Sequence, residues 1–132
     1  MAEANQRGWT TVGDTLTWLK LGIQASCERW GVPSASAASF AASATLGSNP
    51  METIAMAKWT DMFLQGYEAW TEWRRLDFPV LSPPAAAITG TGVPVRNGYG
   101  GLVPTQNKAS YDAAVAAQGP DNQDTKLWWD TK

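Results

Sequence analysis

Aromatic side chains are the groups in this sequence best suited to chemistry, because eight tryptophans and no histidine occur in 132 residues. A tryptophan buries roughly 150–250 Å², and its flat face stacks on sugars, other rings or cations. Histidine is the usual acid–base group near neutral pH, and it is missing. The composition therefore favours packing and binding over catalysis. The tryptophans are Trp9, Trp18, Trp30, Trp59, Trp70, Trp73, Trp128 and Trp129.

The carboxylates do not show the pattern of a catalytic pair. Glycoside hydrolysis needs two acids that face each other across a cleft. Asp61 and Glu72 instead fall on one stripe of a predicted helix, together with Glu68. Lys58 pairs with Asp61, and Glu72 with Arg75, at i,i+3 spacing, which is typical of a solvated face. We therefore predict no catalytic residue and no enzyme activity.

Metal and thiol chemistry are equally weakly supported. Cys27 is the single cysteine, and without a histidine it has neither a catalytic base nor partners for a zinc site. It falls on an apolar helix stripe, which favours a small buried hydrophobic role. Residues 121–124 carry oxygen ligands but lack the pattern of a calcium-binding EF-hand loop, so we predict a polar turn. No metal and no cofactor are expected.

Charge excludes two further classes of partner, nucleic acid and an anionic membrane surface. The net charge is −2, and the ten basic residues are scattered singly or in pairs, so no nucleic-acid surface is expected. No signal peptide and no 18-residue apolar run occurs. The first four residues already read as helix, so we expect Met1 to stand before an internal sequence.

The elements that must position these groups are mainly helices. Residues 1–78 are predicted to be a helical portion with helices over 2–9, 14–30 and 50–75, and a short helix is predicted around 37–42. Residues 79–132 are rich in proline and glycine and are predicted to be irregular, with one short helix over 108–117. Within them, 87–89 and 92–95 are expected to be extended.

The helix over 14–30 is predicted to have neighbours on two sides. Asp14 is the expected N-cap, and Gly31 follows the last turn. One apolar stripe is formed by Leu16, Leu19, Ile23, Cys27 and Trp30, and a second by Trp18, Leu21 and Ala25. A surface helix needs one apolar stripe, so this helix needs additional partners. We therefore expect oligomers or a companion chain.

The helix over 50–75 carries the strongest start signal, with Asn49 as N-cap followed by a proline and an acid. Trp59, Trp70 and Trp73 fall within one apolar arc and are therefore predicted to pack in a core, as are Trp18 and Trp30. Ile54 and Leu64 fall outside that arc. Arg74 lies near its edge and is predicted to stack on an aromatic ring or to fix the following loop.

Four patches of the sequence, in order, resemble the C-terminal part of the SusD/RagB family of outer-membrane lipoproteins. They lie at residues 2–9, 22–32, 57–79 and 94–130. The family's motif positions are matched by Trp59, Trp70, Trp73, Arg74, Arg75, Arg96 and Tyr99. Two positions depart from the family pattern, since Val103 replaces an acid and Ala57 replaces a glutamine.

This resemblance implies a mainly α fold. Tetratricopeptide-like helix pairs would be followed by an irregular, proline- and glycine-rich C-terminal segment that wraps around them. Residues 1–78 and 79–132 would together be a fragment of one larger domain, because family members are several times longer. Such helix pairs need stacked neighbours to bury both faces.

The resemblance also implies a function. The parent protein would capture nutrients, namely oligosaccharides or in some branches peptides, at the cell surface of the outer membrane. It would pass them to a TonB-dependent transporter barrel, and it would reach the membrane only through a lipid anchor that lies outside this sequence. The family's ligand sites draw mostly on upstream loops, so this portion is expected to serve more as scaffold. The alternative is a helical protein–protein interaction module without a small-molecule ligand.

Three tryptophans remain candidates for contact with ligand, namely Trp9, Trp128 and Trp129. Trp128 and Trp129 are adjacent and would point apart in an extended segment, so one should be more exposed than the other. The other five tryptophans are better explained by packing.

Overall fold

The computed structural model describes residues 1–86 and 92–130, which form seven helices and no strand. The all-helical fold predicted from the sequence is therefore confirmed for these residues. The chain divides into two compact units, Met1–Pro79 and Val80–Lys132, which are described separately. None of the described helices combines the length and the apolar character needed to cross a membrane.

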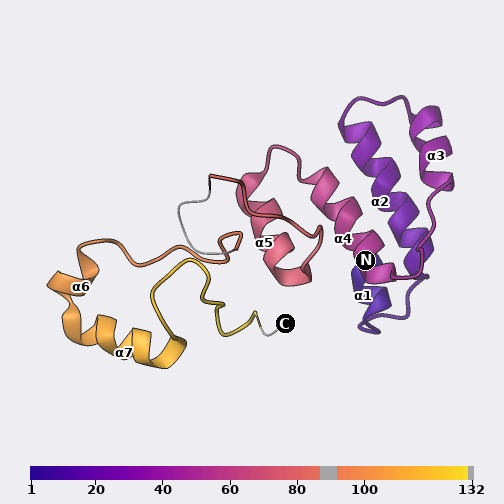
Figure 1. The fold of residues 1–132 in the computed structure, drawn as a ribbon. Coiled ribbons are helices and arrows are strands. Elements are labelled where there is room, and N and C mark those ends of the chain that lie inside the picture. The colour runs from indigo at the N-terminus through magenta and orange to yellow at the C-terminus, as the bar shows by residue number, and fades with distance from the viewer. Residues whose placement is uncertain (87–91, 131–132) are drawn as a thin grey trace. The chain divides into compact units, whose positions relative to one another are not determined.

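The first unit contains five helices, and the two shortest connections between them bring α2 next to α3 and α4 next to α5 (Figure 1). The helices are α1 (Ala2–Gln6), α2 (Thr15–Arg29), α3 (Ser34–Ala42), α4 (Pro50–Asp61) and α5 (Gly66–Leu76). Besides α3, helix α2 contacts α1 and α4. It therefore has neighbours on more than one side, as its two apolar stripes predict.

Helix α2 begins and ends where its sequence signals predict. The side chain of Asp14 accepts a hydrogen bond from the Thr17 amide at 3.0 Å. At the other end Gly31 has a φ of 85°, and its amide donates to the Glu28 carbonyl at 3.0 Å. The Val32 amide donates to the Cys27 carbonyl, also at 3.0 Å, which completes a Schellman motif.

The predicted single helix over 50–75 is wrong, because the chain reverses in its middle. The start is as predicted, with the Asn49 side chain accepting from the Glu52 amide at 3.3 Å. Helix α4 nevertheless ends at Asp61, and Leu64 takes a left-handed conformation with a φ of 69° before α5 begins. The reversal lays α5 against α4. Trp59 thus belongs to a different helix from Trp70 and Trp73, and the shared arc does not exist.

The core of the first unit is small and includes a residue that the predicted arc left out. Buried apolar side chains are Leu19, Ala37, Ala41, Ile54, Ala55 and Leu76. Ala37 and Ala41 are 0% and 2% exposed, so small side chains let α3 approach α2 closely. Ile54 is 2% exposed, whereas Leu64 is 80% exposed. Ile54 fell outside the predicted apolar arc because that arc was drawn for one uninterrupted helix over 50–75.

The first helix is shorter than predicted, and α3 is longer. Helix α1 ends at Gln6 rather than near residue 9, because Gly8 takes a left-handed φ of 72°. Helix α3 extends three residues before the predicted start at 37 and ends at 42 as expected.

Over residues 80–86 and 92–130, the second unit contains two helices in an otherwise irregular segment, α6 (Val103–Gln106) and α7 (Lys108–Gln118) (Figure 1). Helix α7 matches the prediction over 108–117, whereas α6 was not predicted. The predicted extended segment at 92–95 forms no strand, although the Val95 amide donates to the Gln123 carbonyl at 2.8 Å. The other predicted extended segment, 87–89, lies outside the described residues.

Candidate functional site

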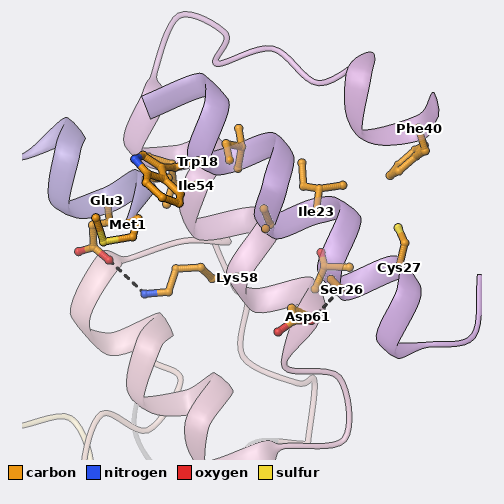
Figure 2. A pocket seen from close by; sticks show the side chains of 15 residues that line it. Met1, Glu3, Trp18, Ile23, Ser26, Cys27, Phe40, Ile54, Lys58 and Asp61 are labelled. Carbon is orange, nitrogen blue, oxygen red and sulfur yellow. Dashed lines mark hydrogen bonds and ion pairs between the residues drawn. The ribbon is translucent and has the colours of Figure 1, made fainter. Parts of the chain in front are cut away.

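An apolar groove of about 490 Å³ lies between α1, α2 and α4 (Figure 2). Its lining includes Trp18, Leu19 and Ile23 from α2, with Ile54 from α4. Phe40 of α3, which is 64% exposed, also lines it. Two polar pairs stand toward its ends, Glu3 with Lys58 and Ser26 with Asp61, as Figure 2 shows. The groove therefore offers an apolar surface between two polar ends.

A cluster of four charged side chains includes the first polar pair of the groove, Glu3 and Lys58. This charge cluster consists of Glu3, Lys58, Glu72 and Arg75. Arg75 Nη2 lies 2.6 Å from Glu3 Oε2 and 2.7 Å from Glu72 Oε2. Lys58 Nζ lies 3.1 Å from Glu3 Oε2 and also contacts Glu72. The cluster ties α1, α4 and α5 together.

This cluster corrects the prediction of a solvated helix face. The Glu72–Arg75 pair at i,i+3 is present, but Arg75 also binds α1 through Glu3. Lys58 does not pair with Asp61, because Asp61 binds Arg29 of α2. The prediction failed because the break in the predicted helix turns one stripe into two packed surfaces.

The cluster holds its acids in the ionised form. Hydrogen bonds from Arg75, and then from Lys58 and Arg7, lower the pKa of Glu3 far below its usual range, against an opposing effect of burial. For Glu72, burial raises the pKa, but the hydrogen bonds from Arg75 and Lys58 together outweigh it and the net pKa is lowered. Acids held this way do not donate protons near neutral pH. The cluster therefore serves structure rather than proton transfer.

Acid should weaken the first unit through this cluster. Because the folded-state pKa of Glu3 is lowered, its stabilisation is fully present above the ordinary glutamate pKa of about 4.3 and is lost progressively as pH falls below it. We expect Glu3→Gln to cost about 1–2 kcal/mol at pH 7, after allowing for partial exposure. Urea unfolding at pH 7 and at pH 3 should show the gap between wild type and variant shrinking in acid. Glu68→Gln, at an exposed site on α5, is the control, and a gap independent of pH would contradict this role.

The second end of the groove leads to an exposed aromatic pair. Ser26 Oγ donates to Asp61 Oδ1 at 2.5 Å, and Arg29 Nη2 donates to the same oxygen at 2.6 Å. The Arg29 guanidinium lies over the Trp30 ring, 5.4 Å from its centroid. Trp30 in turn meets Phe63, with ring centroids 6.2 Å apart and planes inclined by 58°. Trp30 and Phe63 together form the aromatic pair.

A second pocket, of about 390 Å³, opens where α4 turns into α5. Its lining is mostly apolar and consists of Trp59, Thr60, Met62, Phe63, Leu64, Gly66 and Ala69. Phe63 thus belongs both to this turn pocket and to the aromatic pair. Leu64 and Tyr67 are 80% and 81% exposed. The turn of the helix hairpin is therefore an apolar surface open to solvent.

Two tryptophans that were predicted to pack in the core are not buried in this chain. Trp30 is 50% exposed and Trp59 is 37% exposed. Trp18, Trp70 and Trp73 are partly buried. Sequence reasoning missed the aromatic pair, because the break in the predicted helix is what turns Phe63 outward. The one signal for it was Leu64, which did not fit the apolar arc.

The three tryptophans predicted to contact ligand differ in their surroundings. Trp9 is 71% exposed in the first unit, with the Arg7 guanidinium 5.2 Å from its ring centroid. In the second unit Trp128 is 88% exposed and Trp129 is partly buried, so the expected difference between them is confirmed. Trp9 and Trp128 are thus accessible, and their contact with ligand stays a prediction.

The motif residues on α5 fix the end of that helix. Arg74 lies over the Trp70 ring, 3.7 Å from its centroid, so the predicted stacking on an aromatic ring is confirmed. Trp73 Nε1 donates to the Pro79 carbonyl at 3.0 Å. The first contact lies within α5, and the second ties the helix to the segment that follows it.

The motif residues of the second unit gather around one buried arginine. Arg96 is 4% exposed, and its Nη2 lies 3.1 Å from Asp121 Oδ1. Its guanidinium lies 5.4 Å from the Tyr99 ring centroid, and the Tyr99 amide donates to Asp121 Oδ1 at 3.1 Å. Tyr99 meets Tyr111 edge to face, with centroids 5.7 Å apart. This arginine cluster joins the segment before α6 to the segment after α7.

Residues 121–124 form the predicted polar turn. Asn122 Oδ1 accepts hydrogen bonds from the amides of Asp124 and Thr125 at 3.0 and 2.8 Å. The Asp121 carboxylate is engaged by Arg96 rather than facing its acidic neighbours. Across residues 1–86 and 92–130, no three His, Cys, Asp or Glu side chains gather in a way that could hold a metal ion.

Comparison with known protein families matches residues 1–100 to a SusD-like family described as "Starch-binding associating with outer membrane". A search of the curated proteins found no match.

Solved structures resemble nearly the whole chain. A chitin-binding protein is 29% identical, with a TM-score of 0.85 over 99% of this chain and 31% of its own. A Bacteroidetes SusD-like protein is 27% identical, with a TM-score of 0.85 over 99% of this chain and 28% of its own. A chitin-binding SusD homologue from Flavobacterium johnsoniae is 25% identical, with a TM-score of 0.79 over 99% and 34%. The chain thus spans about a third of the length of these relatives.

Proposed function

The chain belongs to the SusD-like family of starch-binding proteins that associate with the outer membrane, and from this membership we propose that it is part of a cell-surface protein that binds nutrient glycans. The observation that carries the proposal is the family match over residues 1–100. The similarity of 99% of the chain to two solved proteins named for chitin binding supports it.

The proposed ligand is an oligosaccharide, and the proposed activity is binding without hydrolysis. Starch and chitin, which the relatives' descriptions name, are both polymers of pyranose rings. Exposed aromatic faces suit such rings, and this chain exposes Trp9, Trp30 and Trp128. The acids of the charge cluster are held ionised by Lys58 and Arg75, which argues against a general acid there.

We place the protein at the outer membrane, where it would pass its ligand to a TonB-dependent transporter barrel. The test is co-purification of the tagged protein from detergent-solubilised outer membranes of its own cells. A TonB-dependent barrel should be recovered in near-stoichiometric amount, and an unrelated tagged outer-membrane protein serves as control. Recovery without any barrel would contradict the delivery role.

A second candidate function is a helical interaction module without a small-molecule ligand. The apolar groove between α1, α2 and α4 favours it, because Phe40, which lines the groove, is 64% exposed. Such a surface predicts that the purified chain self-associates. Sedimentation across a range of concentrations measures this, and a monomer with a cooperative melt at every concentration would contradict it.

A further inference from the structure

We propose that the aromatic pair and the turn pocket beside it form one binding site for an uncharged pyranose that carries an N-acetyl group. This inference rests on the proposed glycan-binding function and assigns to it a place in the fold and a sugar class. Neither Trp30 nor Phe63 was among the ligand residues predicted from the sequence.

The aromatic pair supplies two accessible rings at an angle. Trp30 is 50% exposed and Phe63 is 67% exposed, and their planes are inclined by 58° with centroids 6.2 Å apart. A pyranose has one face rich in C–H bonds, and that face stacks on an indole ring. The inclined Phe63 ring then borders the sugar on one side. Saccharide and small-molecule sites combine such aromatic walls with a few polar groups.

The polar groups stand directly beside Trp30. Arg29 Nη2 donates to Asp61 Oδ1 at 2.6 Å and to the Asp61 carbonyl at 2.7 Å, and both side chains are open to solvent, at 48% and 38% exposure. A guanidinium has five N–H donors, and a carboxylate accepts at two oxygens. They can therefore exchange hydrogen bonds with sugar hydroxyls. Because the two charges balance each other, the site favours a neutral sugar over an anionic one.

The turn pocket supplies the selectivity for an N-acetyl group. It has a volume of about 390 Å³ and a mostly apolar lining, and Phe63 forms part of its wall. A sugar held against Phe63 can therefore place one substituent in this pocket. Transfer of the methyl of an N-acetyl group from water into this pocket is favourable. Transfer of a sugar hydroxyl is unfavourable, because the hydroxyl loses its hydrogen bonds with water. Leu64 sits at the pocket with a left-handed φ of 69°, a costly conformation of the kind found at ligand-binding turns.

The test compares two sugars that differ in one substituent. The purified chain is titrated with the β-linked tetramer of N-acetylglucosamine and with cellotetraose, which shares its backbone but carries a hydroxyl in place of the N-acetyl group. Binding is followed by titration calorimetry. We expect the N-acetylated tetramer to bind about tenfold more tightly, which corresponds to about 1.4 kcal/mol.

Variants then locate the site. Trp30→Ala should weaken binding of the N-acetylated tetramer about tenfold or more, and the half-exposed ring makes the change compatible with folding. Leu64→Asp, at a residue 80% exposed, should remove the preference between the two sugars by placing a charge at the pocket. Leu102→Ala is the control, since it removes an exposed apolar side chain of the second unit that lines neither pocket, and it should leave affinity unchanged.

Several results would overturn the site and leave the proposed function standing. These are equal affinity for the two tetramers, unchanged binding by Trp30→Ala, or the same loss of binding in Leu102→Ala as in Trp30→Ala. No saturable binding of either tetramer would also overturn the site. In that case recovery of a transporter barrel by co-purification would still support the proposed function. If neither tetramer binds and no barrel is recovered, the site and the proposed function are both contradicted.

Discussion

The Arg96→Met variant is expected to destabilise the second unit by about 3–5 kcal/mol, because it leaves the Asp121 carboxylate buried without its cation. The side chains of Arg96 and Asp121 are 5% and 11% exposed, so water cannot take over the lost contacts. The Asp121 carboxylate also accepts a hydrogen bond from the Tyr99 amide, so a shift of this carboxylate disturbs the segment before α6 as well. Methionine fills much of the volume of the arginine stem, which confines the change to the charge and its hydrogen bonds.

Amide hydrogen exchange is the appropriate measurement, because it reports the two units separately. Protection over residues 92–130 should fall strongly in Arg96→Met, while protection over residues 1–79 stays as in wild type. Lys108→Met is the matched control. It breaks the Lys108–Asp112 pair, whose side chains are 73% and 54% exposed, so it should cost no more than about 0.5 kcal/mol. Equal protection in the two variants would show that the buried pair does not organise this unit.

The second large effect is expected at Ile54, where truncation to alanine should cost about 2–5 kcal/mol. Ile54 is 2% exposed on α4 and packs in the small core of the first unit. A core with few large side chains has little capacity to close a cavity. Urea unfolding followed by helix circular dichroism measures the loss.

Leu64 provides the matched control for Ile54, because both changes remove an aliphatic side chain. Leu64 is 80% exposed, so Leu64→Ala should change stability by less than about 0.5 kcal/mol. Leu64→Gly should be stabilising by up to about 1 kcal/mol, because its φ of 69° is costly for leucine and open to glycine. If Ile54→Ala proved as mild as Leu64→Ala, the assignment of the core would be wrong.

The starts of the long helices could be predicted from the sequence, because capping is a local interaction. Asp14 and Asn49 accept hydrogen bonds from the amides three residues later, as their residue types predict. The end of α2 follows equally from Gly31, which takes the left-handed conformation that glycine favours. These features depend on residues within one turn of each other.

The reversal between α4 and α5 could not be predicted from local pattern. Residues 62–65 contain no proline or glycine that marks a turn, and Leu64 is the one apolar residue among them that falls outside the apolar arc. The reversal is stabilised by contacts between distant residues, namely the contacts of Arg75 with Glu3 and of Lys58 with Glu72. A helical pattern was therefore overridden by tertiary packing, and the predicted solvated stripe and the tryptophan arc failed for the same reason.

The candidate site was predicted in part and missed in part. Resemblance to the family drew attention to Arg96 and Tyr99, and the structure places both at Asp121. The sequence also singled out Trp9 and Trp128, which are indeed exposed. The pairing of Trp30 with Phe63 joins the end of α2 to the turn after α4, and a contact between two elements has no signature in either one alone.

Titration of the purified protein with soluble oligosaccharides shows whether this chain binds a glycan. The quenching or shift of tryptophan fluorescence is followed while N-acetylglucosamine and glucose oligomers are added in turn, because exposed indoles report a stacked sugar. We expect a saturable response to at least one of the two series. Glycan binding would be contradicted by a flat response to every oligosaccharide from a folded chain that binds a helical protein partner tightly.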